Sequence, residues 1–150
     1  MTRFEFRVQS VLNWRKTQLD TEESRLKQLV AERAEIDREI AALHAERVLT
    51  ELQIRDAPAI PAVELWALKG YRERARDRAG ALERRRRDCE QRIAAQRERV
   101  TEARRRLRLL EKLRETRQAE WTYLEQRERE NLAGDAYLAR WNARAAAAQD

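Results

Sequence analysis

Residues that turn or bend a chain are scarce in this sequence, which holds 3 glycines and 2 prolines among 150 residues. Because turns depend mainly on Gly, Pro, Asn, Asp and Ser, such a chain folds into a small number of long elements. Its dominant residues, Ala, Glu, Arg, Leu and Gln, are among the stronger helix formers. Charged residues make up 40% of the chain, which is typical of a coiled coil or a long helix. The composition argues against a globular core and against a pocket that excludes water from a reaction.

Single residues and missing motifs exclude several kinds of chemistry. Cys89 is the one cysteine and cannot form a disulfide within the chain, and His44 is the one histidine, whereas a protein metal site needs three or four ligands. The sequence has no Gly-rich phosphate loop, no Ser/His/Asp set and no run of about 18 apolar residues that could span a membrane. Its N-terminus lacks the apolar core and small residues of a signal peptide. We therefore expect a soluble, cytoplasmic protein that is not an enzyme and has no cofactor and no metal.

The stretch RDAPAIPAVEL, residues 55–65, is the one clear break in the sequence. Pro58 and Pro61 lie three residues apart, and a proline inside a helix costs about 3 kcal/mol. A short loop at this break forces the flanking helices to run antiparallel. The sequence therefore predicts one domain, residues 1–150, made of a helix at about 8–55, a loop at about 56–61, a helix at about 62–132 and a C-terminal tail at 133–150.

Apolar residues on both sides of the break follow a heptad repeat with alternating spacings of 3 and 4, the pattern of a left-handed coiled coil. The first seam consists of Val8, Leu12, Leu19, Leu26, Leu29, Ile36, Ile40, Leu43 and Ile54. The second seam consists of Leu65, Leu68, Ala75, Ala79, Leu82, Cys89, Ile93, Val100, Ala103, Leu107, Leu110, Trp121 and Leu124. Charged and polar residues interrupt both seams. The fold class that we predict is all-α, a long two-helix antiparallel coiled-coil hairpin with unequal helices, either modestly stable or in need of partners.

The two predicted helices have unequal lengths, about 72 Å and about 105 Å at 1.5 Å per residue. The second helix is therefore expected to extend past the start of the first by residues 111–132. The early aromatic residues Phe4, Phe6 and Trp14 are placed to meet this stretch, which includes LEKLRETRQAEWTYLE. We expect the N-terminal aromatics to pack where the two tails come together.

The stretch NLAGDAYLARWNARAAAAQD near the C-terminus contains the third glycine of the chain. Gly134 is followed by Asp135, and Gly commonly ends helices while Asp commonly caps them. We therefore predict that the second helix ends at about residue 132. A kink or a short C-terminal tail helix is expected from about residue 136.

Charge is distributed unevenly along the chain. Residues 8–55 carry 8 Lys/Arg and 9 Asp/Glu, a net charge of −1, whereas residues 72–108 carry 15 Arg and 7 Asp/Glu, a net charge of +8. Part of this difference is expected to be electrostatic matching between antiparallel helices, and the rest forms a basic flank. That flank can be a solvated face, a protein-docking surface or a nucleic-acid site. Because no aromatic residue between 72 and 120 is available for base stacking, we expect no nucleic acid.

Four tryptophans are unusual in a thin coiled coil. Trp121 fits the second seam, whereas Trp14, Trp66 and Trp141 do not. An off-seam tryptophan on a long helix can cover a tail, or it can anchor a partner, as Trp often does at protein interfaces. The sequence leaves both roles open.

The two ends of the chain resemble the flagellar export protein FliJ family. FEFRVQSVLNWRKTQLDTEE resembles the N-terminal signature of that family, in which Phe-x-Phe-x-hydrophobic leads into a helix rich in Leu, Arg and Glu. LLEKLRETRQAEWTYLEQRERENLAGDAYLARW resembles its C-terminal helix. The matching positions there are Leu110, Glu111, Lys112, Leu113 and Trp121. Asp135 matches the first residue of the family's acidic pair, but Ala136 replaces the second, and the middle of the chain matches only as a coiled coil.

The resemblance implies an antiparallel coiled coil similar to the central stalk of rotary ATPases. It implies that the paired tails enter the ring of the hexameric flagellar export ATPase and connect it to the cytoplasmic domain of the export gate. It also implies an escort for substrate-specific export chaperones, cytoplasmic and peripherally associated with the inner-membrane export apparatus. The residues implied at the ATPase ring are Phe4, Phe6, Trp14, Leu113 and Trp121. The residues implied at the export gate are Tyr71, Ala75, Arg78 and Leu82, although Ala75 and Leu82 can also be plain seam residues.

Three other functions stay open at this point. One is the equivalent stalk protein of an injectisome, related to the YscO-like proteins, which composition does not distinguish from a flagellar one. A nucleic-acid-binding coiled coil accounts for the basic flank, and its affinity would fall steeply with salt. A plain structural coiled coil predicts self-association without an ATPase partner.

Overall fold

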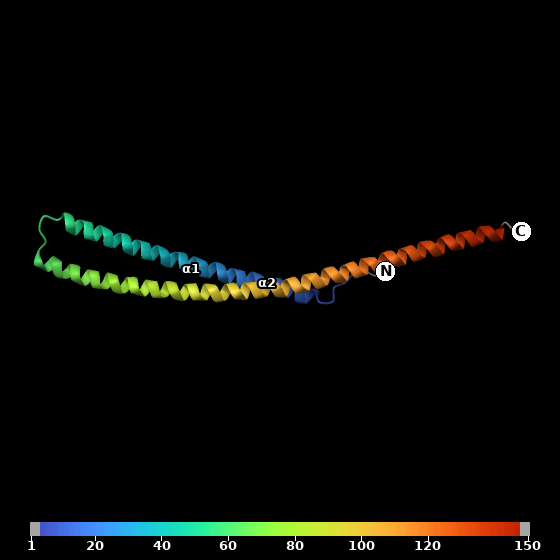
Figure 1. Ribbon diagram of the computed structural model, residues 1–150, viewed down its shortest axis with the longest axis horizontal. Coiled ribbons are helices and arrows are strands. Elements are labelled where there is room, and N and C mark those ends of the chain that lie inside the picture. Colours follow the sequence, from blue (N-terminus) through green and yellow to red (C-terminus); the bar gives the residue numbers. More distant parts are fainter. Residues whose placement is uncertain (1–3, 148–150) are drawn as a thin grey trace. The chain divides into compact units, whose positions relative to one another are not determined.

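In the computed structural model, which describes residues 4–147, the chain forms two α-helices (Figure 1). Helix α1 runs Gln9–Asp56 and helix α2 runs Ala62–Ala147, and the described residues contain no strand. The two long helices pack against each other. This confirms the all-helical fold of two long, unequal helices that the sequence predicted.

The chain divides into two compact units, and each helix contributes to both. The hairpin unit consists of Gln18–Ala103, and the terminal unit consists of Met1–Thr17 together with Arg104–Asp150. The hairpin unit therefore contains the loop, most of α1 and the first half of α2. The terminal unit contains the start of α1 and the last part of α2.

The loop between the helices is short, spanning residues 57–61, and it contains both prolines. The Ala57 amide donates a hydrogen bond to the Ile54 carbonyl at 3.3 Å, which closes the last turn of α1. The Pro61 carbonyl accepts hydrogen bonds from the amides of Glu64 and Leu65 at 3.0 and 3.2 Å. Pro61 thus stands just before α2, where its lack of an N–H group leaves no helical hydrogen bond unmade.

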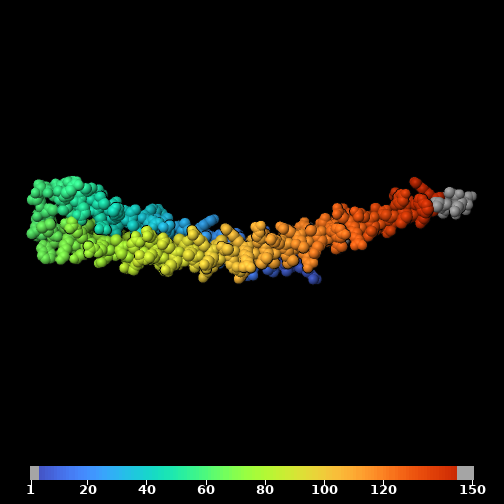
Figure 2. All heavy atoms as spheres, viewed as in Figure 1, coloured from blue at the N-terminus to red at the C-terminus, as the bar shows by residue number. Residues whose placement is uncertain are grey.

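The core of the hairpin unit is the seam that the heptad pattern predicted. One cluster of buried residues contains Ile36, Cys89 and Ile93, with Leu26, Leu29 and Ile40 packed against it. A second cluster contains Leu43, Ala75 and Leu82, with Ile40, Tyr71 and Ala79 packed against it. Within this unit the side chains of the two helices lie directly against each other (Figure 2). A narrow row of apolar residues from each helix is therefore enough to bury a continuous core.

Ion pairs between α1 and α2 flank this seam. Arginine nitrogens of α2 meet glutamate oxygens of α1 in the pairs Arg72–Glu51 at 2.7 Å, Arg85–Glu39 at 3.4 Å and Arg92–Glu32 at 3.2 Å. Residue numbers fall along α1 as they rise along α2, so the helices of the hairpin unit are antiparallel. The pairs confirm that part of the charge difference between the helices is electrostatic matching. The hydrogen bond from Arg72 holds the pKa of Glu51 below its ordinary value.

Two buried groups complete the seam of the hairpin unit. Gln96 is 5% exposed, and its side-chain amide donates to the Glu22 carbonyl at 3.0 Å and also to the Glu22 carboxylate. Cys89 is 1% exposed, and its Sγ donates to the Leu29 carbonyl at 3.4 Å. Burial raises the pKa of the Cys89 thiol, so this side chain acts as a small apolar residue.

The second helix does not end where the sequence predicted. Helix α2 continues through Gly134 and Asp135 to Ala147, so the predicted end at about residue 132 and the separate short tail helix are wrong. No glycine among the described residues has a positive φ, so Gly134 does not form the left-handed cap that would stop the helix. One exposed glycine costs a helix only about 1 kcal/mol, and the alanines and leucines around it favour continuation. Of the expected tail, residues 148–150 lie outside the described residues.

Candidate functional site

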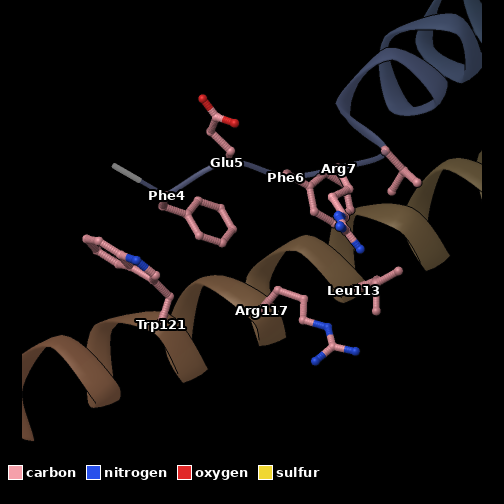
Figure 3. A pocket seen from close by; sticks show the side chains of 8 residues that line it. Phe4, Glu5, Phe6, Arg7, Leu113, Arg117 and Trp121 are labelled. Carbon is pink, nitrogen blue, oxygen red and sulfur yellow. The ribbon is translucent and has the colours of Figure 1, made fainter. Parts of the chain in front are cut away.

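The first described residues of the terminal unit form a short extended segment ahead of α1. In extended backbone, alternate side chains point to the same side, and Phe4 and Phe6 both turn toward α2 while Glu5 turns away from it (Figure 3). The Gln9 amide donates to the Phe6 carbonyl at 2.9 Å, which links the segment to the first turn of α1. The Phe-x-Phe spacing therefore presents two rings to one helix face.

The facing surface of α2 carries residues that lie four apart and so share one side of the helix. These residues are Leu113, Arg117 and Trp121. The Phe4 and Trp121 rings lie 6.0 Å apart between centroids at an interplanar angle of 54°, an edge-tilted aromatic contact. The sequence predicted this meeting of the N-terminal aromatics with the stretch around Trp121.

Between the segment and α2 lies an open groove, which we call the aromatic groove. It has a volume of about 720 Å³ and is lined by Phe4, Glu5, Phe6, Arg7, Val8, Leu113, Arg117 and Trp121. Phe4, Phe6 and Trp121 are half-buried, whereas Leu113 is 43% exposed. The groove thus offers apolar side chains and ring faces to solvent, with exposed charges beside them. Such a surface suits an apolar side chain of a protein partner better than a small polar substrate.

Trp14 is separate from the aromatic groove. Its side chain is 52% exposed, and the Arg15 guanidinium lies 4.6 Å from the centre of its ring. Of the five residues assigned to the ATPase ring, the structure brings together Phe4, Phe6, Leu113 and Trp121. Trp14 lies elsewhere on the first turns of α1.

The four residues assigned to the export gate differ in their exposure. Ala75 and Leu82 are 4% and 6% exposed and belong to the core of the hairpin unit. Tyr71 is half-buried against the same cluster, and its hydroxyl is buried without a hydrogen-bond partner. Arg78 is exposed. In the closed hairpin, a partner can therefore touch Arg78 directly, whereas α1 covers Ala75 and Leu82.

Several residues of the aromatic groove were not singled out from the sequence. Val8 was assigned only to the seam, and Glu5 and Arg7 lie between or beside the two phenylalanines. Arg117 interrupts the heptad, but its position four residues from both Leu113 and Trp121 was the signal that could have placed it in the groove. Its guanidinium also pairs with Glu120 at 2.9 Å.

The described part of the chain offers no group of three or more His, Cys, Asp and Glu side chains arranged to hold a metal ion. Some carboxylates of both helices pair with arginines three or four residues away, as in Arg25–Glu22 and Arg129–Glu125. In the same described residues, neither helix has a stretch long and apolar enough to cross a membrane. The aromatic groove is therefore the feature that best fits a functional site.

Comparison with known proteins gives one family. The family model described as flagellar FliJ protein matches residues 4–146, which is nearly the whole chain and includes both the aromatic groove and the hairpin unit. No curated protein and no solved structure matches the chain. The match takes in the Phe-x-Phe segment, the two long helices and the stretch around Trp121, and the chain therefore belongs to the flagellar FliJ protein family.

Proposed function

We propose that this chain is a non-enzymatic component of the flagellar type III protein export apparatus and acts as the central stalk and activator of the hexameric export ATPase. Family membership supports a role in flagellar export. The observation that carries the finer proposal is the aromatic groove, where four of the five implied ring-contact residues come together. In this proposal the groove is the working end, and ring subunits insert apolar side chains between Phe4, Phe6 and Trp121.

The hairpin unit is proposed to link the ATPase to the cytoplasmic domain of the export gate. The contact lies around Tyr71 and Arg78 on the part of α2 that follows the loop, with Ala75 and Leu82 holding that surface from inside the seam. Export chaperones are proposed to bind and exchange on the same protein. Its place is the cytoplasm, peripherally associated with the inner-membrane export apparatus.

A matched pair of leucine variants tests the working end. Leu113 lines the aromatic groove and Leu109 does not, and both are exposed, at 43% and 61%. Because neither is buried, replacement by Ser changes the thermal stability of the chain little in either case. Leu113→Ser is expected to lower stimulation of the cognate ATPase several-fold and to impair motility, whereas Leu109→Ser leaves both unchanged. Equal stimulation by the two variants would refute the groove as the contact.

The double variant Phe4→Ser, Phe6→Ser separates a contact role from a clamp that holds the two tails together. If these rings contact the ATPase, stimulation falls several-fold while the melting temperature changes little. If they act as a clamp through the Phe4–Trp121 contact, melting shifts clearly and the remaining folded protein stimulates normally. Melting and ATPase stimulation measured on the same preparation decide between the two.

A further inference from the structure

Ion pairs along one edge of the hairpin unit recur once per heptad. Arg85 meets Glu39 at 3.4 Å. Arg92, seven residues later on α2, meets Glu32, seven residues earlier on α1, at 3.2 Å. Residues that flank the seam of a coiled coil pair in this way along its length. The two pairs therefore fix which residue of α1 stands opposite each residue on this edge of α2.

One heptad further from the loop, the same register places two like charges opposite each other. Arg99 follows Arg92 by seven residues, and Arg25 precedes Glu32 by seven. The residue of α1 that faces this edge is thus glutamate at positions 39 and 32 but arginine at position 25. Two positive charges repel each other, so Arg99 lacks the acidic partner that the neighbouring arginines of its row have.

Arg25 and Arg99 line one open groove of the hairpin unit, which we call the arginine groove. It has a volume of about 380 Å³, and its lining includes Arg25, Gln28, Leu29, Arg92, Ala95 and Arg99. The three arginines are exposed, whereas Leu29 is half-buried against the cluster around Ile36. The groove therefore combines guanidinium groups with apolar surface.

Two of these arginines already have an acidic partner and the third has none. The Arg25 guanidinium lies 3.0 Å from a carboxylate oxygen of Glu22, and Arg92 is paired with Glu32. Within residues 4–147, Arg99 makes no ion pair and no hydrogen bond through its side chain. One unbalanced positive charge therefore remains at the groove.

We infer that the arginine groove binds an acidic side chain of a protein partner, with its carboxylate between Arg99 and Arg25. One carboxylate balances the one unpaired guanidinium and separates the two like charges. Hydrogen bonds between guanidinium and carboxylate groups are stronger than those between neutral groups. The incoming group thus takes the place that Glu32 holds opposite Arg92.

The apolar part of the groove favours a protein side chain over a free anion. Ala95 is exposed and its small side chain leaves room beside Leu29. The methylene groups of a glutamate or aspartate can lie against these two residues while its carboxylate reaches Arg99. Inorganic phosphate has no apolar part that could use this surface.

Binding of a hexaglutamate peptide to the full chain tests the inference. With a fluorescein-labelled peptide at low ionic strength, Arg99→Gln should raise the dissociation constant measured by fluorescence anisotropy about threefold, as expected for an exposed ion pair. Arg84→Gln is the matched control, because Arg84 is an exposed arginine on the face of α2 opposite the seam. It removes the same charge and should change the dissociation constant little. Inorganic phosphate should displace the peptide no better than sodium chloride of equal ionic strength.

A charge reversal tests whether Arg25 and Arg99 face each other, without any ligand. Arg99→Glu gives Arg25 an acidic partner across the seam, so its melting temperature should exceed that of Arg84→Glu by about 1–3 °C. Its new carboxylate also fills the groove, so Arg99→Glu should bind the peptide more weakly than Arg84→Glu. Higher stability together with weaker binding is a combination that damage to the fold cannot produce.

Three results would overturn the inference. Equal weakening by Arg99→Gln and Arg84→Gln would mean that the peptide follows net charge alone. Equal melting temperatures of the two glutamate variants would mean that Arg25 and Arg99 do not face each other. Displacement of the peptide by phosphate at a lower ionic strength than sodium chloride requires would assign the groove to phosphate instead. The assays contain no ATPase, so their outcome is independent of the proposed function.

Discussion

The hairpin unit and the terminal unit use similar helices in different ways. In the hairpin unit the seam residues of α1 and α2 cover each other, so that Ile36 and Cys89 are 0% and 1% exposed. In the described part of the terminal unit, Leu12 is the one buried apolar residue, while Trp141 is 60% exposed. Helix propensity sustains both units, but the first buries far more of its apolar residues. Many large apolar residues of the second, such as Leu109, Tyr137 and Trp141, remain exposed.

The largest loss of stability is expected when a buried side chain is removed from the seam of the hairpin unit. Ile36→Ala is expected to lower the free energy of unfolding by about 2–5 kcal/mol, because it leaves a cavity in the fully buried cluster. Leu138→Ala, at an exposed position of α2, is the control and should change it by less than about 0.5 kcal/mol. Urea denaturation followed by circular dichroism measures both, and similar losses would show that the two units are equally dependent on packing.

The buried amide of the hairpin unit should have the next largest effect. Gln96→Ala removes the donor to the Glu22 carbonyl and carboxylate and is expected to cost about 1–3 kcal/mol. Gln91 is exposed on the same helix, so Gln91→Ala serves as the matched control and should be nearly neutral. A neutral Gln96→Ala would mean that water replaces the amide in the seam.

Glycines near the loop should make that part of α2 the weakest of the hairpin unit. A Cβ added at Gly80 meets the end of the Arg84 side chain at 3.5 Å, an ordinary contact, so Gly80→Ala should raise the free energy of unfolding by about 0.5–1 kcal/mol. In the unaltered chain, amide hydrogen exchange is expected to be faster at residues 64–82 than at residues 89–103. Equal protection of the two stretches would contradict this expectation.

The exposed ion pairs should contribute least. The pKa of Glu51 is lowered by its hydrogen bond from Arg72, so the paired carboxylate stabilises the fold at neutral pH and loses this effect as the pH falls through and below its ordinary value. The small difference in melting temperature between Glu51→Gln and the unaltered chain should therefore be present at pH 7, begin to shrink near the ordinary Glu pKa of about 4.3, and vanish only below the lowered pKa of Glu51. High salt should also reduce it, because both partners are solvated.

Much of the fold could be predicted because a single heptad repeat of apolar residues determines which side chains are buried between the helices. A repeat of 3 and 4 places Ile36, Leu43, Cys89 and Ile93 on seams, and the structure buries all four. The C-terminal end of α2 could not be predicted from this repeat. Gly134 and Asp135 are typical of a helix end, but they terminate a helix only when some other structure competes with it, and nothing in the flanking sequence does.

The candidate site was predictable in part. Two helices of unequal length joined by a short loop bring Phe4 toward Trp121, so the sequence could predict that pair. The groove itself depends on which face α2 turns toward the extended segment, and that selects Leu113 and Arg117. Trp14 shows the limit of composition as a guide, because an aromatic residue in the right stretch can still lie on another face of its helix, beside Arg15.

The buried thiol of Cys89 can be used to measure how often α1 and α2 separate in the hairpin unit. It is the only thiol in the chain and lies between the helices at 1% exposure. A thiol reagent can reach it only when α1 and α2 separate locally. At low reagent concentration the labelling rate therefore follows the equilibrium between closed and open states, and at high concentration it levels off at the rate of opening. Labelling one natural atom thus measures how often the two helices part, with no engineered probe.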